Sequence, residues 1–268
     1  MKIKQSILGF CVLLMILVGV SACSRSQQQS VTLAGSTAFQ PFAEKLAEVY
    51  MSTHPNVRIN VQGGGSAVGV QSAVAGNADI GMADMLTLPD EAKVLTATIV
   101  ARDGIAIIVH PTNSMTEMTT QQAKDIFSGK ITNWKDVGGS DAEIRVFSRE
   151  EGSGTRKSFD NLVLETEKVS ASALFQNSNG TIREAVANDA NAIGYLSIGL
   201  VNERVRAVSY SNVDPSNENV KKGLYPLARP IFFLTKPGVN AQTKGFVDYV
   251  LTDDAQKILE KEGLIAAK

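Results

Sequence analysis

The segment 148–159, which reads SREEGSGTRKSF, places Arg149 just ahead of a Gly-Ser-Gly-Thr turn. A strand-like run over 144–147 leads into the segment, and a helix is predicted to follow over 156–164. This order gathers a guanidinium, hydroxyl groups and several free backbone N–H groups around one point. Such a point suits a small oxyanion that carries more than one charge. The segment therefore predicts one side of an anion site and leaves the other side to be found elsewhere in the chain.

Two further turns offer the same chemistry. Residues 35–37 (Gly-Ser-Thr) and 65–66 (Gly-Ser) each separate a predicted strand from a predicted helix, as residues 153–155 (Ser-Gly-Thr) do. Hydroxyl groups and N–H groups at the start of a helix attract anions, and glycine allows the backbone to approach closely. One such turn is explained by ordinary helix capping. Three of them, together with Arg149, favour an anion site.

Asp84 follows a predicted strand over 77–83 and would place a carboxylate beside the anion. Hydrogen phosphate has a proton to donate to this carboxylate, whereas sulfate at neutral pH has none. Asp84 would then reject sulfate at a cost on the order of several kcal/mol. The spacing is equally compatible with Asp84 as a cap of the next segment. Arg149 could likewise form a surface ion pair with Glu150 or Glu151, and such a pair could orient it for a bidentate contact.

The order of the predicted elements indicates an α/β fold. Strands over 31–33, 57–61 and 77–83 alternate with helices over 39–50 and 68–75. This alternation is typical of parallel sheets, which bind ligands beyond the carboxyl ends of their strands.

Two apolar segments could join separate lobes. The first, 105–109, would carry the chain from one lobe to the other, and the second, 229–234, would carry it back. Other predictions are a helix over 120–127, a helix over 181–188 capped by Thr181, a loop over 211–225 and one amphipathic helix over 243–262.

The amino-terminal residues are typical of an exported lipoprotein. Two lysines precede an apolar run over 7–20 that is too short for an ordinary membrane span. Small residues before Cys23 resemble a bacterial lipobox, in which the cysteine is lipidated and becomes the first mature residue. An ordinary cleaved signal with a leftover cysteine is the alternative. We expect residues 1–22 to be a signal peptide and residues 23–30 to be a polar tether that begins at the lipidated Cys23.

Cleavage would change the composition of the chain. Removing residues 1–22 from 268 leaves 246, which is enough for one large domain or two smaller lobes. Cys11 would be lost, so the mature chain would have neither a free thiol nor a disulfide. Basic residues would fall from 26 to 24 against 27 acidic residues, a net charge of about −3. A mildly acidic chain has no general attraction for nucleic acid, so local groups must hold any anion.

The sequence gives little support for an enzyme or a cofactor-binding protein. His54 and His110 both precede proline in predicted surface turns, and there is no Gly-x-Ser-x-Gly nucleophile elbow. The chain has neither the His and Cys spacing of a metal site nor a nucleotide-binding glycine loop. We expect a binding protein with no catalytic residue, no cofactor and no metal. A binding protein for sulfate or molybdate is the nearest alternative, and Asp84 argues against it.

Several motifs of the chain together resemble one family, the PstS-type phosphate-binding lipoproteins, which are the substrate-binding components of a phosphate ABC importer. The motifs are AGSTAF at 34–39, GGGS at 63–66, AD at 83–84, IFSGKITNW at 126–134, REEGSGT at 149–155, IGY at 193–195 and YPL at 225–227. The resemblance extends over nearly all of the mature chain.

This resemblance implies a type II periplasmic-binding fold, in which two α/β lobes joined by crossing strands close on phosphate. Lobe 1 would comprise residues 31–106 and 226–268, and lobe 2 residues 107–225. The implied phosphate contacts are Ser36, Thr37, Ala38, Ser66, Asp84, Arg149, Ser153, Gly154 and Thr155.

The resemblance also implies partners and a location. The protein would be a monomer, held through Cys23 on the outer face of the cell membrane or facing the periplasm of a Gram-negative envelope. It would deliver inorganic phosphate to the permease and ATPase subunits of the importer. Besides a binding protein for another oxyanion, a phosphate-sensing lipoprotein and a phosphohydrolase are the alternatives.

Overall fold

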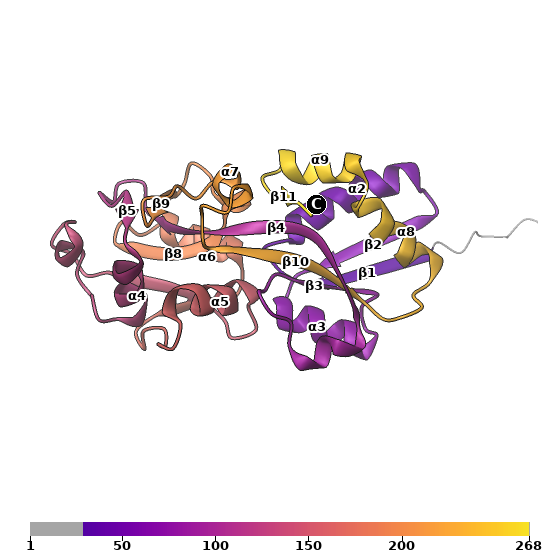
Figure 1. Ribbon diagram of the computed structural model, residues 1–268, viewed down its shortest axis with the longest axis horizontal. Helices are drawn as coiled ribbons and strands as arrows, with labels where there is room; N and C mark the ends of the chain where they lie inside the picture. The colour runs from indigo at the N-terminus through magenta and orange to yellow at the C-terminus, as the bar shows by residue number, and fades with distance from the viewer. Residues whose placement is uncertain (1–28, 268) are drawn as a thin grey trace, which may run out of the picture.

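The structure is a computed structural model that describes residues 29–267. The predicted signal peptide, Cys23 and most of the predicted tether lie outside these residues. Two α/β lobes lie at opposite ends of a pair of long strands, with the N-terminal and C-terminal segments in one lobe and the middle of the chain in the other (Figure 1). We call them lobe 1 and lobe 2.

Lobe 1 begins with the predicted alternation of strands and helices. The strands β1 (Gln29–Gly35), β2 (Val57–Gln62) and β3 (Ile80–Ala83) pair in parallel, with β1 between the other two. The helices α2 (Gln40–Thr53) and α3 (Ser66–Ala75) connect them. The carboxyl ends of the three strands therefore lie at one edge, where the turns before α2 and α3 also lie.

The two crossing strands are β4 (Thr96–Val109) and β10 (Ala228–Thr235), which pair antiparallel along their length. The last part of β4 extends into lobe 2, where it pairs with β8 (Ala192–Ser197) and β9 (Arg206–Tyr210). The predicted strand over 105–109 is thus the second half of a longer strand. Because β10 is also antiparallel to β3, the sheet is mixed rather than wholly parallel.

Lobe 2 repeats the strand and helix pattern around β6 (Arg145–Arg149), which pairs in parallel with β7 (Leu174–Gln176) and β8. Its helices are α4 (Thr120–Ser128), α5 (Gly154–Phe159), which continues as a wider turn over Asp160–Leu164, and α6 (Asn179–Ala187). Short one-turn helices occupy Trp134–Val137 and Ile198–Leu200 in lobe 2, and another occupies Asp90–Val94 in lobe 1.

Two sequence predictions were wrong in detail, and some short strands were missed. The closing helix is two helices, α8 (Ala241–Val250) and α9 (Asp253–Lys261), because Thr252 caps the second by accepting a hydrogen bond from Ala255 N. The predicted loop over 211–225 contains α7 (Asn217–Lys221). The strands β5 (Glu117–Met118) and β11 (Ile265–Ala266) are too short to produce a periodic pattern and were not predicted.

Each lobe has its own large hydrophobic core. In lobe 1, Phe39 packs edge-to-face against Phe233, with ring centroids 5.7 Å apart, and Phe246 joins them from α8. In lobe 2, Phe159 stacks on Tyr195 with centroids 3.9 Å apart. The lobe 1 core therefore takes residues from both ends of the chain.

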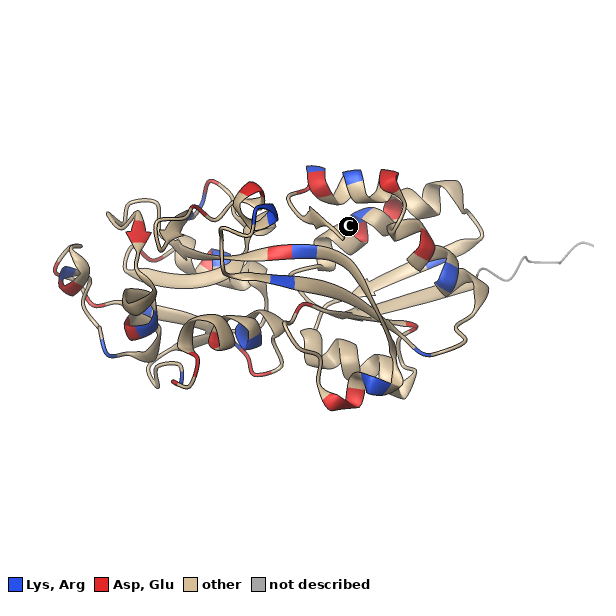
Figure 2. Cartoon of the chain, viewed as in Figure 1, with Lys and Arg blue, Asp and Glu red and all other residues tan. Residues whose placement is uncertain are grey.

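The charged residues are spread over both lobes. Figure 2 shows both acidic and basic residues on the helices of each lobe, and a few charged residues on the crossing strands. Across residues 29–267, every helix falls short of the length and apolar character that crossing a membrane requires.

Candidate anion-binding site

The three predicted turns lie at the starts of helices. Ser153 is the N-cap of α5, and its Oγ accepts a hydrogen bond from Arg156 N at 3.2 Å. Ser66 is the first residue of α3. Ser36 Oγ accepts from Phe39 N at 3.1 Å, so it caps the turn that leads into α2 rather than the helix itself. All three serines are buried.

The turns of lobe 1 contact those of lobe 2 directly. Thr37 Oγ1 accepts a hydrogen bond from Arg149 Nη2 at 3.2 Å, and Thr155 Oγ1 donates to Asp84 Oδ2 at 2.9 Å. Ala67 N donates to Gly152 O at 3.1 Å. The predicted halves of the site therefore face each other.

Six of the predicted site residues contact or closely approach one another: Thr37, Ser66, Asp84, Arg149, Gly154 and Thr155. The other three, Ser36, Ala38 and Ser153, adjoin them in the chain and are buried too.

Arg149 is the buried cation at the carboxyl end of β6, with a side chain that is only 1% exposed. Its Nε and Nη2 each donate to a carboxylate oxygen of Glu150 at 2.9 Å. Glu150, and not Glu151, is thus the acid that orients the guanidinium. Nε also donates to Gln176 O at 3.1 Å. Nη1 is buried and has no hydrogen-bond partner among the described residues. An unpaired buried donor is costly, so Nη1 is available for an acceptor placed in the site.

Asp84 lies just beyond β3 and is 2% exposed. Its Oδ1 accepts from Ser66 Oγ at 2.5 Å, while Oδ2 accepts from Thr155. Arg229 Nη1 lies 2.6 Å from the same Oδ2. The carboxylate therefore has a fixed orientation, with one lone pair of Oδ1 left for a further donor.

Gly154 is a point of close approach between the two lobes at this site. A Cβ atom on Gly154 would lie 2.3 Å from Ser66 Oγ and 2.8 Å from Asp84 Oδ1. Only a residue without a side chain permits this approach. The glycine in the middle of the Ser-Gly-Thr turn thus lets the start of α5 lie against Asp84.

Three further residues of the site were missed from the sequence. Arg229 on β10 contacts both Asp84 and Asp103 of β4. Asn179 at the start of α6 donates from Nδ2 to Thr37 Oγ1 and Thr155 Oγ1, both at 3.4 Å. The only sequence signal for Arg229 and Asp103 was a charge at a predicted crossing strand.

Among residues 29–267, the site combines hydroxyl and N–H donors with the guanidinium groups of Arg149 and Arg229 and the carboxylate of Asp84, and both histidines lie in other contacts. His54 stacks on Tyr50 at a centroid distance of 3.9 Å, and His110 bonds to the side chain of Thr112. Within residues 29–267, no three His, Cys, Asp or Glu side chains gather closely enough to bind a metal ion. The arrangement suits reversible binding of an oxyanion that has a proton.

A family model described as a PBP superfamily domain matches residues 21–254. The chain is also 35% identical over 241 residues to the phosphate-binding protein PstS of Bacillus subtilis, an alignment that covers 88% of this chain and 80% of that protein. The chain belongs to the PstS family of the PBP superfamily. The resemblance inferred from the motifs is confirmed.

Solved structures of similar proteins have the same fold. A Clostridium perfringens structure, described as a phosphate ABC transporter substrate-binding protein with bound phosphate, is 38% identical with a TM-score of 0.86 and covers 90% of this chain and 100% of its own. An ABC-type phosphate transport receptor from Vibrio cholerae is 36% identical with a TM-score of 0.74, covering 89% of this chain and 100% of its own. The two-lobed periplasmic-binding fold is confirmed for this member of the PstS family.

Proposed function

We propose that this protein binds inorganic phosphate between its two lobes and delivers it to an ABC-type permease without catalysing a reaction. The observation that carries the proposal is Arg149, a fully buried cation whose Nη1 has no partner among the described residues, placed beside the helix starts of both lobes. The names and the bound phosphate of the relatives in the PstS family support the same ligand.

The proposed contacts come from both lobes. Lobe 1 supplies the hydroxyl groups and backbone N–H groups of Ser36, Thr37, Ala38 and Ser66, together with Asp84. Lobe 2 supplies Arg149, Ser153, Gly154 and Thr155. Because phosphate would contact both sets at once only when the lobes are together, it would stabilise the closed arrangement over an open one.

We propose that lobe 1 comprises residues 31–106 and 226–268 and that lobe 2 comprises residues 107–225. Ile105 and Leu227 stand just on the lobe 1 side of these limits, and their side chains pack in the lobe 2 core. The passage between lobes thus falls within or next to the crossing strands, which are the segments that must bend when the lobes open.

The proposal extends to the location and partners of the protein. We infer a monomer, exported and anchored through a lipid on Cys23, that docks in its closed form on the permease and ATPase subunits of an importer. The lipobox-like motif and the family of the chain support this location.

A competition titration of the purified protein tests the function directly. Phosphate, sulfate, molybdate and ATP are each titrated by calorimetry, and only phosphate is expected to bind tightly. Tight binding of sulfate or molybdate would show that phosphate is not the specific ligand. Hydrolysis of ATP would show that the protein is an enzyme and not a binding protein.

Substitution of Gly154 by alanine is expected to weaken phosphate binding by about 1–3 kcal/mol, the usual cost of forcing an extra methyl group into packed structure. The new Cβ would push α5 away from Ser66 and Asp84. The matched control is Gly152→Ala, whose Cβ would meet only Ala67 Cβ at an ordinary 3.4 Å. Equal affinities of the two variants, measured by calorimetry, would show that the close approach at Gly154 does not matter for binding.

A further inference from the structure

A buried chain of charges runs from Asp84 into the crossing strands. The Arg229 side chain is 0% exposed and lies between two carboxylates, with Nη1 2.6 Å from Asp84 Oδ2 and Nη2 2.9 Å from Asp103 Oδ2. Nη1 also donates to the backbone oxygen of Asp84 at 3.2 Å. Arg229 therefore fixes both the carboxylate and the backbone of Asp84.

Asp103 in turn fixes Arg229. The two residues face each other in the antiparallel register of β4 and β10. The other carboxylate oxygen of Asp103 accepts a hydrogen bond from Ser197 Oγ of lobe 2 at 2.8 Å. Burial raises the pKa of the Asp103 carboxyl above its usual value, and the Arg229 guanidinium acts against this rise. The cation is thus held by a strand that both lobes share.

The orientation of the Asp84 carboxylate decides what the site can accept. A carboxylate accepts hydrogen bonds, so it pairs with a ligand oxygen that has a proton and repels one that has none. A buried carboxylate also needs a cationic partner. At 2.6 Å from Oδ2, the Arg229 guanidinium is that partner.

Within residues 29–267, Arg229 is the charged side chain that contacts the Asp84 carboxylate. The other contacts of the carboxylate are uncharged hydroxyl groups, Ser66 from α3 and Thr155 from α5. Asp103 is hydrogen-bonded to Arg229, and its own pKa is raised further by the nearby charge of Asp84. Arg149 of β6 contacts lobe 1 through Thr37.

We propose that Arg229, held by Asp103, is a specificity-determining positioning residue that fixes the orientation of the Asp84 carboxylate and thereby makes a proton on the ligand a requirement for binding. This inference rests on the phosphate-binding function proposed above. It gives the crossing strands a part in ligand selection as well as in joining the lobes.

The test replaces the ion pair by a neutral pair, Arg229→Gln together with Asp103→Asn. This double variant conserves the net charge and leaves no unpaired charge at positions 103 and 229. The Asp84 carboxylate then lacks the guanidinium that orients it. Sulfate is the probe, because it carries no proton between weakly acidic and neutral pH.

The wild-type protein is expected to reject sulfate, because the oriented Asp84 carboxylate faces an anion that has no proton to donate. In the double variant, the preference for phosphate over sulfate should fall at least about tenfold, because the carboxylate is no longer held by the guanidinium. Calorimetry with both anions at one pH measures the ratio of affinities. A double variant that binds phosphate and keeps the wild-type preference overturns the proposal.

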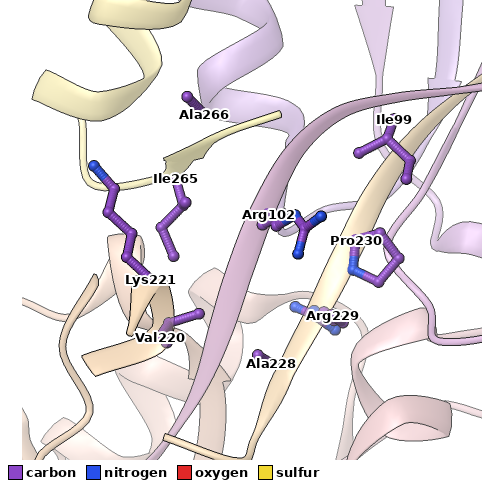
Figure 3. Close-up of a pocket in the computed structure, with 9 residues that line it drawn as sticks. All are labelled: Ile99, Arg102, Val220, Lys221, Ala228, Arg229, Pro230, Ile265 and Ala266. Carbon is purple, nitrogen blue, oxygen red and sulfur yellow. The ribbon is translucent and has the colours of Figure 1, made fainter. Parts of the chain in front are cut away.

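Two controls separate the charge from the fold. Arg229→Lys keeps a cation at the site but loses the bridge made by two guanidinium nitrogens, so its preference for phosphate is expected to lie between those of the wild type and the double variant. A preference below that of the double variant contradicts the proposal. Lys221→Gln with Glu260→Gln removes a different ion pair between the lobes, 2.6 Å long and half-exposed, and should leave selectivity unchanged. Lys221 lines a groove of about 450 Å³ beside the crossing strands (Figure 3). Absence of phosphate binding by the wild-type protein would instead refute the proposed function.

Discussion

Replacement of Arg149 by alanine is expected to weaken phosphate binding by about 2–5 kcal/mol, the usual effect of truncating one partner of a buried charge pair. The guanidinium is 1% exposed and has a free Nη1. Without it, a buried phosphate dianion would lose the cation at the carboxyl end of β6. Isothermal titration calorimetry with phosphate measures the change, and a urea unfolding curve shows whether the variant is folded.

Arg145→Ala is the matched control for this prediction. Arg145 lies on the same strand, β6, but its side chain is 59% exposed and pairs with Asp189 at 2.7 Å. Exposed ion pairs contribute only about 0–1 kcal/mol, so this variant loses the same charge with little effect expected on phosphate affinity. A folded Arg149→Ala protein with the wild-type affinity would remove Arg149 from the binding site.

Substitution of Asp84 by asparagine is expected to reduce the preference for phosphate over sulfate by an amount on the order of 2 kcal/mol, the cost of one unsatisfied buried polar contact. An amide can donate a hydrogen bond to an unprotonated oxyanion, and it no longer repels sulfate. Phosphate affinity should fall as well, because the amide oxygen is a weaker acceptor than a carboxylate. Calorimetric titrations with both anions at one pH give the ratio of affinities.

The same titrations on Asp90→Asn control for the loss of one negative charge in lobe 1. The Asp90 side chain is 92% exposed and pairs only with Lys93 at the surface. Its selectivity should match that of the wild type. If Asp84→Asn rejects sulfate as strongly as the wild-type protein, then Asp84 is not the acceptor that distinguishes the two anions.

Local patterns made most of the candidate site predictable. The turns at 35–37, 65–66 and 153–155 each follow a strand and precede a helix, so their hydroxyl groups could be placed from the sequence alone. Arg149 ends the short strand β6, and Asp84 directly follows the short strand β3. Parallel pairing within each lobe then brings these residues to one edge, because the carboxyl ends of parallel strands meet there.

The residues that were missed depend on contacts over long distances in the chain. Arg229 and Asp103 are 126 positions apart, and only the antiparallel register of β4 and β10 makes them partners. Asn179 was missed for a different reason. The helix was predicted to start at Thr181, but Ser178 is its N-cap and Thr181 completes the capping box, so Asn179 lies in the first turn.

The assembly of the lobe 1 core from both ends of the chain has a consequence for folding. Phe39 and Leu46 near the amino terminus cannot complete their core until Phe233 and Phe246 are present. Lobe 2, by contrast, is built almost entirely from one continuous stretch and can complete its own core first. Chains generally fold in units as they are synthesised. Lobe 1 must wait for the last helices of the chain, so this lobe alone stays unfolded until synthesis ends.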